Sequence, residues 1–145
     1  MLAAYASSAD FNDPLSGLVV GDVPEPDVPA GWTTVQMKAA SLNHHDLWSL
    51  RGIGLPTERL PMILGCDAAG LDENGREIVV YSIVSDAPIG IDETIDESRS
   101  ILSERFPGTF SERFAVPARN LIPKPPNWTW SQAACLPTAW LTAYR

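Results

Sequence analysis

Two adjacent histidines and an aspartate stand together in the stretch SLNHHDLWSLRG, which runs from Ser41 to Gly52. Imidazole and carboxylate groups can bind a metal ion or transfer a proton. Neighbouring residues of a helix point about 100° apart, so His44 and His45 do not easily face one ion. Either histidine could donate a proton near a pocket, and the alternative is a capping or surface role. We take His45 as a candidate catalytic residue.

Asp46 and Cys66 are the next candidates, and each has a structural alternative. Asp46 could orient a pocket side chain by accepting a hydrogen bond, but an aspartate near a helix start also stabilises the helix dipole. Cys66 lies in an apolar run, where a free cysteine usually packs as a small hydrophobic residue. The only other cysteine is Cys135, so neither a four-cysteine zinc site nor a disulfide scaffold is expected.

Strands and a few short helices must position these residues. From Trp32 to Ala40 apolar and polar residues alternate, which predicts a half-buried strand. The segment that follows predicts a short helix closed by Gly52. The apolar runs 61–70 and 76–84, joined by the turn sequence DENG, predict two further strands.

The two remaining segments are an acidic stretch and the last helix. Residues 86–104, which we call the acidic segment, predict a surface excursion with one helical turn near Ser98. Residues 130–145 have the alanine content and spacing of a helix interrupted at Pro137. Because an amphipathic helix normally continues to a cap or packs on another element, we expect a further segment beyond Arg145.

Composition and charge limit the function classes. The 145 residues fit one domain, and 45% of them are apolar, as in a globular protein. A net charge of -8 repels phosphate backbones and anionic lipid surfaces, which argues against nucleic acid and membranes as partners. The chain has no run of about 20 apolar residues and no signal sequence, so a cytoplasmic location is expected.

Three stretches carry a family resemblance in their order along the chain: GDVPEPDVPAGWTTVQMKAASLNHHDL, LPMILGCDAAG, and GTFSERFAVPARNLIPKPPNWTWSQAACLPTAWLTAY. Together they resemble the amino-terminal GroES-like domain of the medium-chain dehydrogenase/reductase family, which includes zinc-type alcohol dehydrogenases and quinone oxidoreductases. The resemblance implies a mainly β fold with short helices, a partly open β-barrel ending in the helix that leads to a Rossmann domain. We expect residues 1–145 to be this catalytic domain, incomplete and without the Rossmann coenzyme domain, because no G-x-G-x-x-G fingerprint occurs.

The resemblance also implies where a catalytic zinc would bind. Asn43 falls at the first cysteine ligand of the zinc-dependent members, Cys66 at the histidine, Asp67 at the nearby carboxylate, and Thr138 near the third ligand. Only Cys66 and Asp67 are ordinary zinc ligands, so they are the remaining metal candidates and zinc is not expected.

The pattern instead resembles the zinc-free quinone-oxidoreductase branch, in which an asparagine at the place of Asn43 lines the pocket. Hydride there passes from NADPH to an enone or quinone, which implies NADP or NAD as the cofactor. Thr142 matches the threonine that contacts the nicotinamide, and Thr138 shares its helix face. The resemblance thus implies that Asn43 and Asp46 face the substrate pocket, and these two with His45 are the catalytic candidates. Thr142, by resemblance, and Thr138, which lies on the same helix face, are the coenzyme-binding candidates; the alternative for this face is that the threonines bond back to the preceding turn.

Two functions stay open at this point. The chain could be the substrate-binding half of an NAD(P)-dependent oxidoreductase that acts on a carbonyl, an enone or an alcohol and is inactive alone. It could also be a non-catalytic truncated product or an interaction module that docks through its last helix. The expected partners are a small-molecule substrate and either a coenzyme domain or a second copy of the chain.

Overall fold

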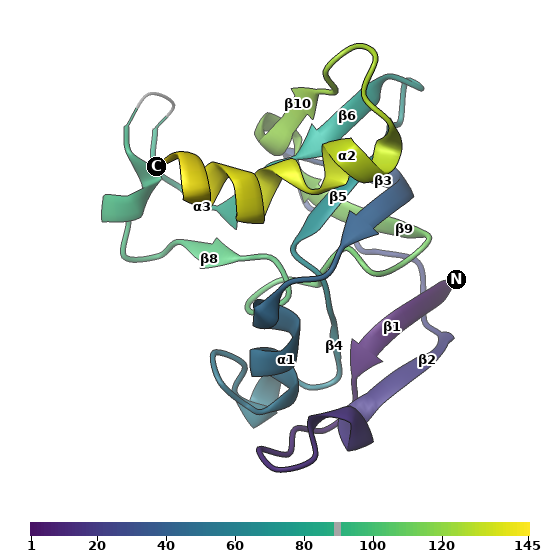
Figure 1. The fold of residues 1–145 in the computed structure, drawn as a ribbon, viewed down its shortest axis with the longest axis vertical. Coiled ribbons are helices and arrows are strands. Elements are labelled where there is room, and N and C mark those ends of the chain that lie inside the picture. Colours follow the sequence, from purple (N-terminus) through teal and green to yellow (C-terminus); the bar gives the residue numbers. More distant parts are fainter. Residues whose placement is uncertain (89–90) are drawn as a thin grey trace.

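Short antiparallel strands dominate the fold, which a computed structural model describes for residues 1–88 and 91–145 (Figure 1). The strands are β1 Leu2–Ala6, β2 Leu18–Asp22, β3 Trp32–Ser41, β4 Met62–Ile63, β5 Asp67–Asp72, β6 Glu77–Val80, β7 Ile83–Val84, β8 Ser100–Ile101, β9 Arg113–Pro117 and β10 Leu121–Pro123. The helices are α1 His44–Leu50, α2 Trp130–Ala134, a π-helix Leu136–Trp140 and α3 Leu141–Tyr144, with short 3-10 turns between strands. In the described part of the chain no helix is long and apolar enough to cross a membrane.

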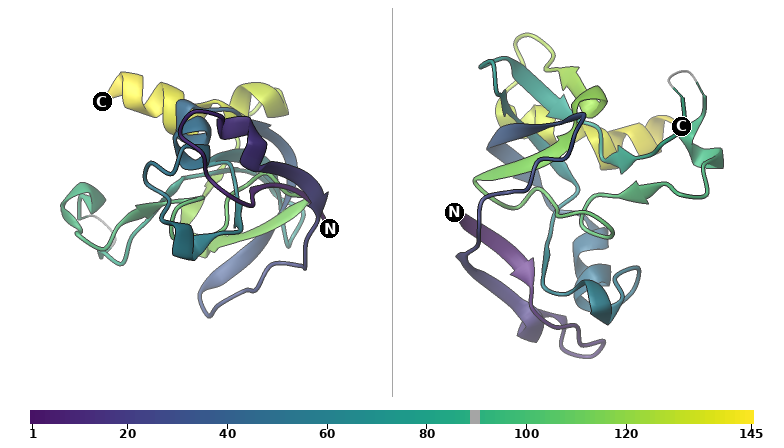
Figure 2. Two further views of the ribbon diagram at one scale, coloured as in Figure 1. Left: turned by 90° about the horizontal axis from the view of Figure 1, so that it is seen from below. Right: turned by 180° about the vertical axis from the view of Figure 1, so that it is seen from behind.

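The strands curl into a partly open barrel. The central sheet has the order β10-β6-β5-β3-β9, and a second sheet has the order β2-β1-β4. Backbone hydrogen bonds tie β1 to the segment that leads into β9, since the N–H of Ala4 donates to the Phe110 carbonyl and the N–H of Glu112 donates to the Leu2 carbonyl. Figure 2 shows β1 and β2, in purple, at the end of the molecule away from the C-terminal helices. The predicted fold class, mainly β with short helices, is confirmed.

Strand β3 follows the predicted alternation until a bulge interrupts it. Val35 is fully buried, whereas Gln36 and Lys38 are exposed. The pairing with β5 then shifts register between Met37 and Ala39. Past this bulge Ser41 lies opposite Asp67, at the end of β3 that leads into α1.

The predicted turns are present where glycine allows them. Gly52 has a φ of 77° directly after the C-cap of α1, and Gly75 has a φ of 76° in the turn between β5 and β6. Both positions lie in the left-handed region, which glycine adopts without steric cost.

The C-terminal helices lie across the central sheet. Ala133 and Ala134 of α2 are fully buried against Ala69 and Val79 of the sheet. The predicted interruption at Pro137 is confirmed as a π-helix that joins α2 to α3. Proline cannot donate a backbone bond and its ring collides with the carbonyl four residues earlier, so a wider turn suits this position.

The acidic segment leaves the barrel and returns to it. It contains a 3-10 turn at Glu93–Ile95, a turn at Glu97 and Ser98, and β8, which pairs with β7. Residues 89 and 90 lie outside the described residues. After β8 the chain runs back toward α1, where Ser103 is fully buried.

Candidate active site

Asp67 is the centre of a buried polar cluster between β3, α1 and the π-helix. Its carboxylate is fully buried at the start of β5. Oδ2 accepts hydrogen bonds from the Ser41 hydroxyl at 2.9 Å and from the Asn43 amide at 3.0 Å, and Oδ1 accepts one from the Thr138 hydroxyl at 2.6 Å. Three segments that are distant in sequence therefore meet at one carboxylate.

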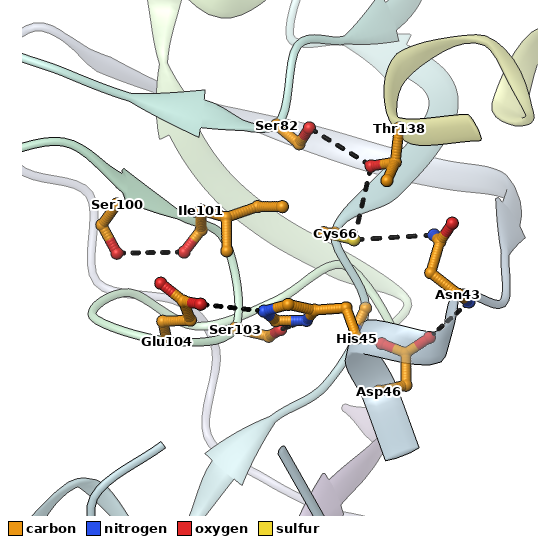
Figure 3. Close-up of polar contacts among 11 residues, drawn as sticks. Asn43, His45, Asp46, Cys66, Ser82, Ser100, Ile101, Ser103, Glu104 and Thr138 are labelled. Carbon is orange, nitrogen blue, oxygen red and sulfur yellow. Dashed lines mark hydrogen bonds and ion pairs between the residues drawn. The ribbon is translucent and has the colours of Figure 1, made fainter. Parts of the chain in front are cut away.

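Asn43 stands at the N-cap of α1, but its side chain points into the cluster. Its amide group lies 3.5 Å from the Cys66 sulfur (Figure 3). The same group lies within hydrogen-bond distance of Asp67. The backbone N–H of Asn43 donates instead to the Asp46 carboxylate at 2.8 Å. Asp46 thus accepts the hydrogen bond of the N-cap N–H, and the Asn43 side-chain amide contacts the polar cluster.

Asp46 ties α1 to the loop before β5. It is 5% exposed, and its second oxygen accepts a hydrogen bond from the Gly65 N–H at 3.1 Å. Burial raises the pKa of this carboxyl, against the two backbone hydrogen bonds, which lower it. Asp46 lies directly beneath Asn43 and holds the first turn of the helix in place.

Cys66 lies between Asn43 and Thr138 as a buried thiol. Its sulfur is 3.6 Å from the Thr138 hydroxyl oxygen. Burial, with a smaller contribution from the nearby carboxylates of Asp67 and Asp46, raises the pKa of the thiol to about 12. The group is therefore a neutral thiol near pH 7 and a poor nucleophile.

Thr138 joins this cluster, whereas Thr142 lies one turn further along on the exposed side. The Thr138 hydroxyl oxygen is 3.5 Å from that of Ser82, besides its bond to Asp67. Thr142 lines a small pocket of about 160 Å³ together with Thr138, Ser82 and Tyr81. The two threonines thus share the border of one pocket, but only Thr138 reaches the polar cluster.

His45 is turned away from the cluster. Its Nε2 lies 3.0 Å from Glu104 Oε1, and its Nδ1 lies 3.4 Å from the Ser103 hydroxyl oxygen. Figure 3 shows the imidazole directed toward these two residues at the end of the acidic segment. His44 is exposed beside the ring of Trp48.

Four polar residues of this region were missed by the sequence analysis. They are Ser41, Ser82, Ser103 and Glu104. Ser41 alone had a local signal, since it ends the strand that leads into the helix. The others reach the site through strand pairing and a long return of the chain, which no local pattern encodes.

The donor set at the family's zinc position does not suit a zinc ion. The contacts of 3.5 and 3.6 Å around Cys66 resemble the spacing of neighbouring ligands in a tetrahedral site. The contacting groups, however, are an amide, a hydroxyl and a protonated thiol, and zinc prefers thiolate and imidazole. Among residues 1–88 and 91–145, no group of three or more His, Cys, Asp or Glu side chains could hold a metal ion.

Comparisons of sequence place these features beside known proteins. The family model described as the alcohol dehydrogenase GroES-like domain matches residues 29–126. A zinc-type alcohol dehydrogenase-like protein of Schizosaccharomyces pombe is 30% identical, over 92% of this chain and 42% of its own length. A crotonyl-CoA carboxylase/reductase of Cereibacter sphaeroides is 26% identical, over 92% of this chain and 35% of its own length. The chain thus spans less than half of the length of these relatives.

A comparison of structures agrees with the sequence match. The crystal structure of an NAD-dependent alcohol dehydrogenase superimposes with a TM-score of 0.86 and 31% sequence identity. The match covers 99% of this chain and 45% of that protein. The barrel, the first helix and the C-terminal helices described above are therefore all part of the shared architecture.

Proposed function

The chain belongs to the family of alcohol dehydrogenase GroES-like domains, and on that premise we propose that it is the substrate-pocket part of an NAD(P)-dependent, zinc-independent oxidoreductase. The reaction is hydride transfer to a carbonyl, enone or quinone, or from an alcohol in the reverse direction. The polar cluster around Asp67 carries this proposal, because the Asn43 amide stands there as a hydrogen-bond donor and the groups around it are not a zinc ligand set.

Asn43 would orient the substrate oxygen. Its amide has two N–H groups: Asp67 holds one of them, and the other, which makes only a long contact of 3.5 Å to the Cys66 sulfur, can donate to an oxygen that gains negative charge as the hydride arrives. The single hydrogen of the Thr138 hydroxyl is donated to the other oxygen of Asp67, so Thr138 fixes the carboxylate that directs the amide. The bound nicotinamide coenzyme would supply the hydride, and its reactive end would lie toward Thr142 and Thr138 at the small pocket.

The coenzyme domain is the proposed partner of the terminal apolar face, which we define as Ile122, Trp140, Leu141 and Tyr144. Trp140 is 65% exposed and Tyr144 is 89% exposed, beside an apolar groove of about 450 Å³. Exposed aromatic side chains around a groove mark a surface that a partner covers. The relatives carry more than half of their length outside the matched region, which supplies a covering domain.

The same face supports the second candidate function, a non-catalytic interaction module. In that case the covering partner is another protein or a second copy of this chain. The two candidates differ in one respect, since only the oxidoreductase needs the Asn43 amide for its activity.

A chimera tests the proposed function. This chain would replace the matching region of the Schizosaccharomyces pombe relative, and oxidation of NADPH and NADH would be followed at 340 nm with quinone and enone acceptors. We expect turnover that survives a metal chelator and falls on the order of 100-fold in Asn43→Ala. The coenzyme part alone and the chimera with Asn74→Ala, a turn residue, are the controls. No turnover with any acceptor, while the chimera binds NADPH, would favour the interaction module.

A further inference from the structure

Both ring nitrogens of His45 are engaged by the end of the acidic segment. Nε2 lies 3.0 Å from Glu104 Oε1 and Nδ1 lies 3.4 Å from the Ser103 hydroxyl oxygen (Figure 3). The His45 side chain is 14% exposed and that of Glu104 is 31% exposed, so the pair is mostly shielded from water. We propose that Glu104 is a positioning residue that, with Ser103, clamps the His45 ring and thereby fixes the first turn of α1.

The chemistry of the three groups selects one tautomer of the neutral ring. A carboxylate only accepts hydrogen bonds, so Nε2 must carry the hydrogen. In the neutral ring Nδ1 is then the acceptor, and the Ser103 hydroxyl donates to it. Neither nitrogen is left to give a proton to a substrate held by Asn43. His45 therefore acts through the helix rather than on the substrate.

The backbone around Ser103 is built to hold this contact. Ser103 has a φ of 69°, which is unusual for a residue with a side chain, and it is fully buried. Its N–H donates to the Phe106 carbonyl at 2.9 Å, and the Leu102 N–H donates to the Ser82 carbonyl at 3.0 Å. A non-glycine residue is kept in this region only where its surroundings determine it, and such residues gather at functional sites.

The clamp reaches the site through one short helix. His45 stands between Asn43, whose amide enters the polar cluster, and Asp46, which holds the Asn43 and Gly65 N–H groups. Helix α1 has only the residues His44–Leu50, so it gains little stability from its own length. A ring held at both nitrogens prevents the helix start from rotating and keeps the Asn43 amide aimed at Asp67. The role of the clamp in catalysis rests on the proposed function, whereas the contacts that form the clamp do not.

Nitrogen NMR of the 145-residue chain tests the clamp directly. The chain has two histidines, and exposed His44 serves as an internal reference. At a pH where both rings are neutral, we expect His45 to show the Nε2–H form almost alone and His44 a mixture. Glu104→Gln should move His45 toward a mixture, because the amide can donate as well as accept. Glu97→Gln, at an exposed position of the same segment, should leave the spectrum unchanged.

Two further variants keep the test decisive. Ser103→Ala should shift the Nδ1 signal and leave the hydrogen on Nε2, since only the donor to Nδ1 is lost. An unchanged His45 ring in both Glu104→Gln and Ser103→Ala would overturn the clamp, as would an Nδ1–H ring in the unmodified chain.

The chimera adds a functional readout. There we expect Glu104→Gln and His45→Asn to lower kcat/KM to a similar extent, on the order of 10-fold, because each releases the same helix start. A loss in His45→Asn more than tenfold beyond that in Glu104→Gln would identify His45 as the proton donor and overturn the positioning role. If the unmodified chimera has no activity, the proposed function fails while the NMR result still decides the clamp.

Discussion

Asp67 is fully buried and has three side-chain donors, so its removal should cost stability as well as activity. In Asp67→Ala the Ser41, Asn43 and Thr138 donors lose their acceptor inside the protein. We expect the free energy of unfolding to fall by about 3 kcal/mol, since each buried unsatisfied group costs about 1–3 kcal/mol. Urea denaturation would measure it, with exposed Asp27→Ala as the control at under about 0.5 kcal/mol. A loss below 1 kcal/mol would show that water replaces the carboxylate.

The Cys66 thiol should be unreactive in the folded protein. Burial raises its pKa to about 12 from 9.0, so the reactive thiolate is scarce even at pH 9. Half-exposed Cys135 should react with an aromatic disulfide reagent at pH 8, and the second thiol should appear only after denaturation. In Cys135→Ser no thiol should react until the chain unfolds. Rapid labelling of Cys66 in that folded variant would contradict the burial of this group.

The donor geometry around Cys66 can be converted into a metal site. Asn43→Cys, Cys66→His and Thr138→Cys together place two thiols and an imidazole where the amide, the thiol and the hydroxyl now meet. We expect the triple variant to bind Co²⁺ with the visible absorption of a tetrahedral thiolate site. A matched triple variant with serine in place of both new cysteines should show no such bands. Equal spectra for the two variants would mean that these positions do not converge on one ion.

Much of this cluster was predictable only through family resemblance. Asn43, Cys66, Asp67 and Thr138 were expected near one another because they match the family's ligand positions. Their hydrogen bonds were not predictable, because they depend on the bulge in β3 and on the π-helix. The engagement of His45 by Glu104 was also missed, since 59 residues separate the two and no local pattern connects them.

The loop between β4 and β5 depends on one glycine whose replacement should lower the stability of the protein. Gly65 has a φ of 90°, and an added Cβ would come within 2.3 Å of the Phe110 ring. Gly75 has a similar φ of 76° in its turn, but nothing lies within 4 Å of its Cβ position. A comparison of alanine variants at the two positions therefore separates the energetic cost of the left-handed backbone from the cost of steric overlap.

Gly65→Ala should destabilise the protein well beyond Gly75→Ala. We expect about 1 kcal/mol for Gly75→Ala from the left-handed backbone alone, and at least about 3 kcal/mol for Gly65→Ala, which adds a clash in the core. Thermal or urea denaturation of both variants would measure the difference. Equal losses would show that Phe110 moves aside without cost.

The elements themselves were easier to predict from sequence than their deviations. The alternation in β3, the glycine that ends α1 and the turn between β5 and β6 are local signals, and each is confirmed. Near Ser98, where a helical turn was predicted, the chain makes a single hydrogen-bonded turn, and the 3-10 turn lies slightly earlier, at Glu93–Ile95. Both precede a strand that pairs with β7. That pairing brings the acidic segment back to the barrel, and composition alone gave no indication of it.

At the scale of the whole molecule, we expect the terminal apolar face to be the main surface that binds apolar molecules. Replacing Trp140 and Tyr144 with serine should lower the fluorescence of a bound naphthalene sulfonate dye several-fold, because these side chains are 65% and 89% exposed beside the groove. The free energy of unfolding should change little, since exposed side chains contribute little to it. Leu42→Ser, at an exposed leucine of a different surface, is the control for both measurements. Unchanged dye binding in the double variant would show that the dye binds to another surface.

The π-helix at Leu136–Trp140 changes the direction in which side chains point along the continuous C-terminal helix. Before this wide turn, the sheet fixes which side of the helix faces inward, because Ala133 and Ala134 are buried against it. At the end of the wide turn and in α3 the helix directs Trp140 and Tyr144 outward, while Thr138 within the turn still contacts Asp67. Deleting one residue from the wide turn would rotate every later side chain by about 100°. The wide turn thus sets which side of the helix meets a partner and which side meets the site.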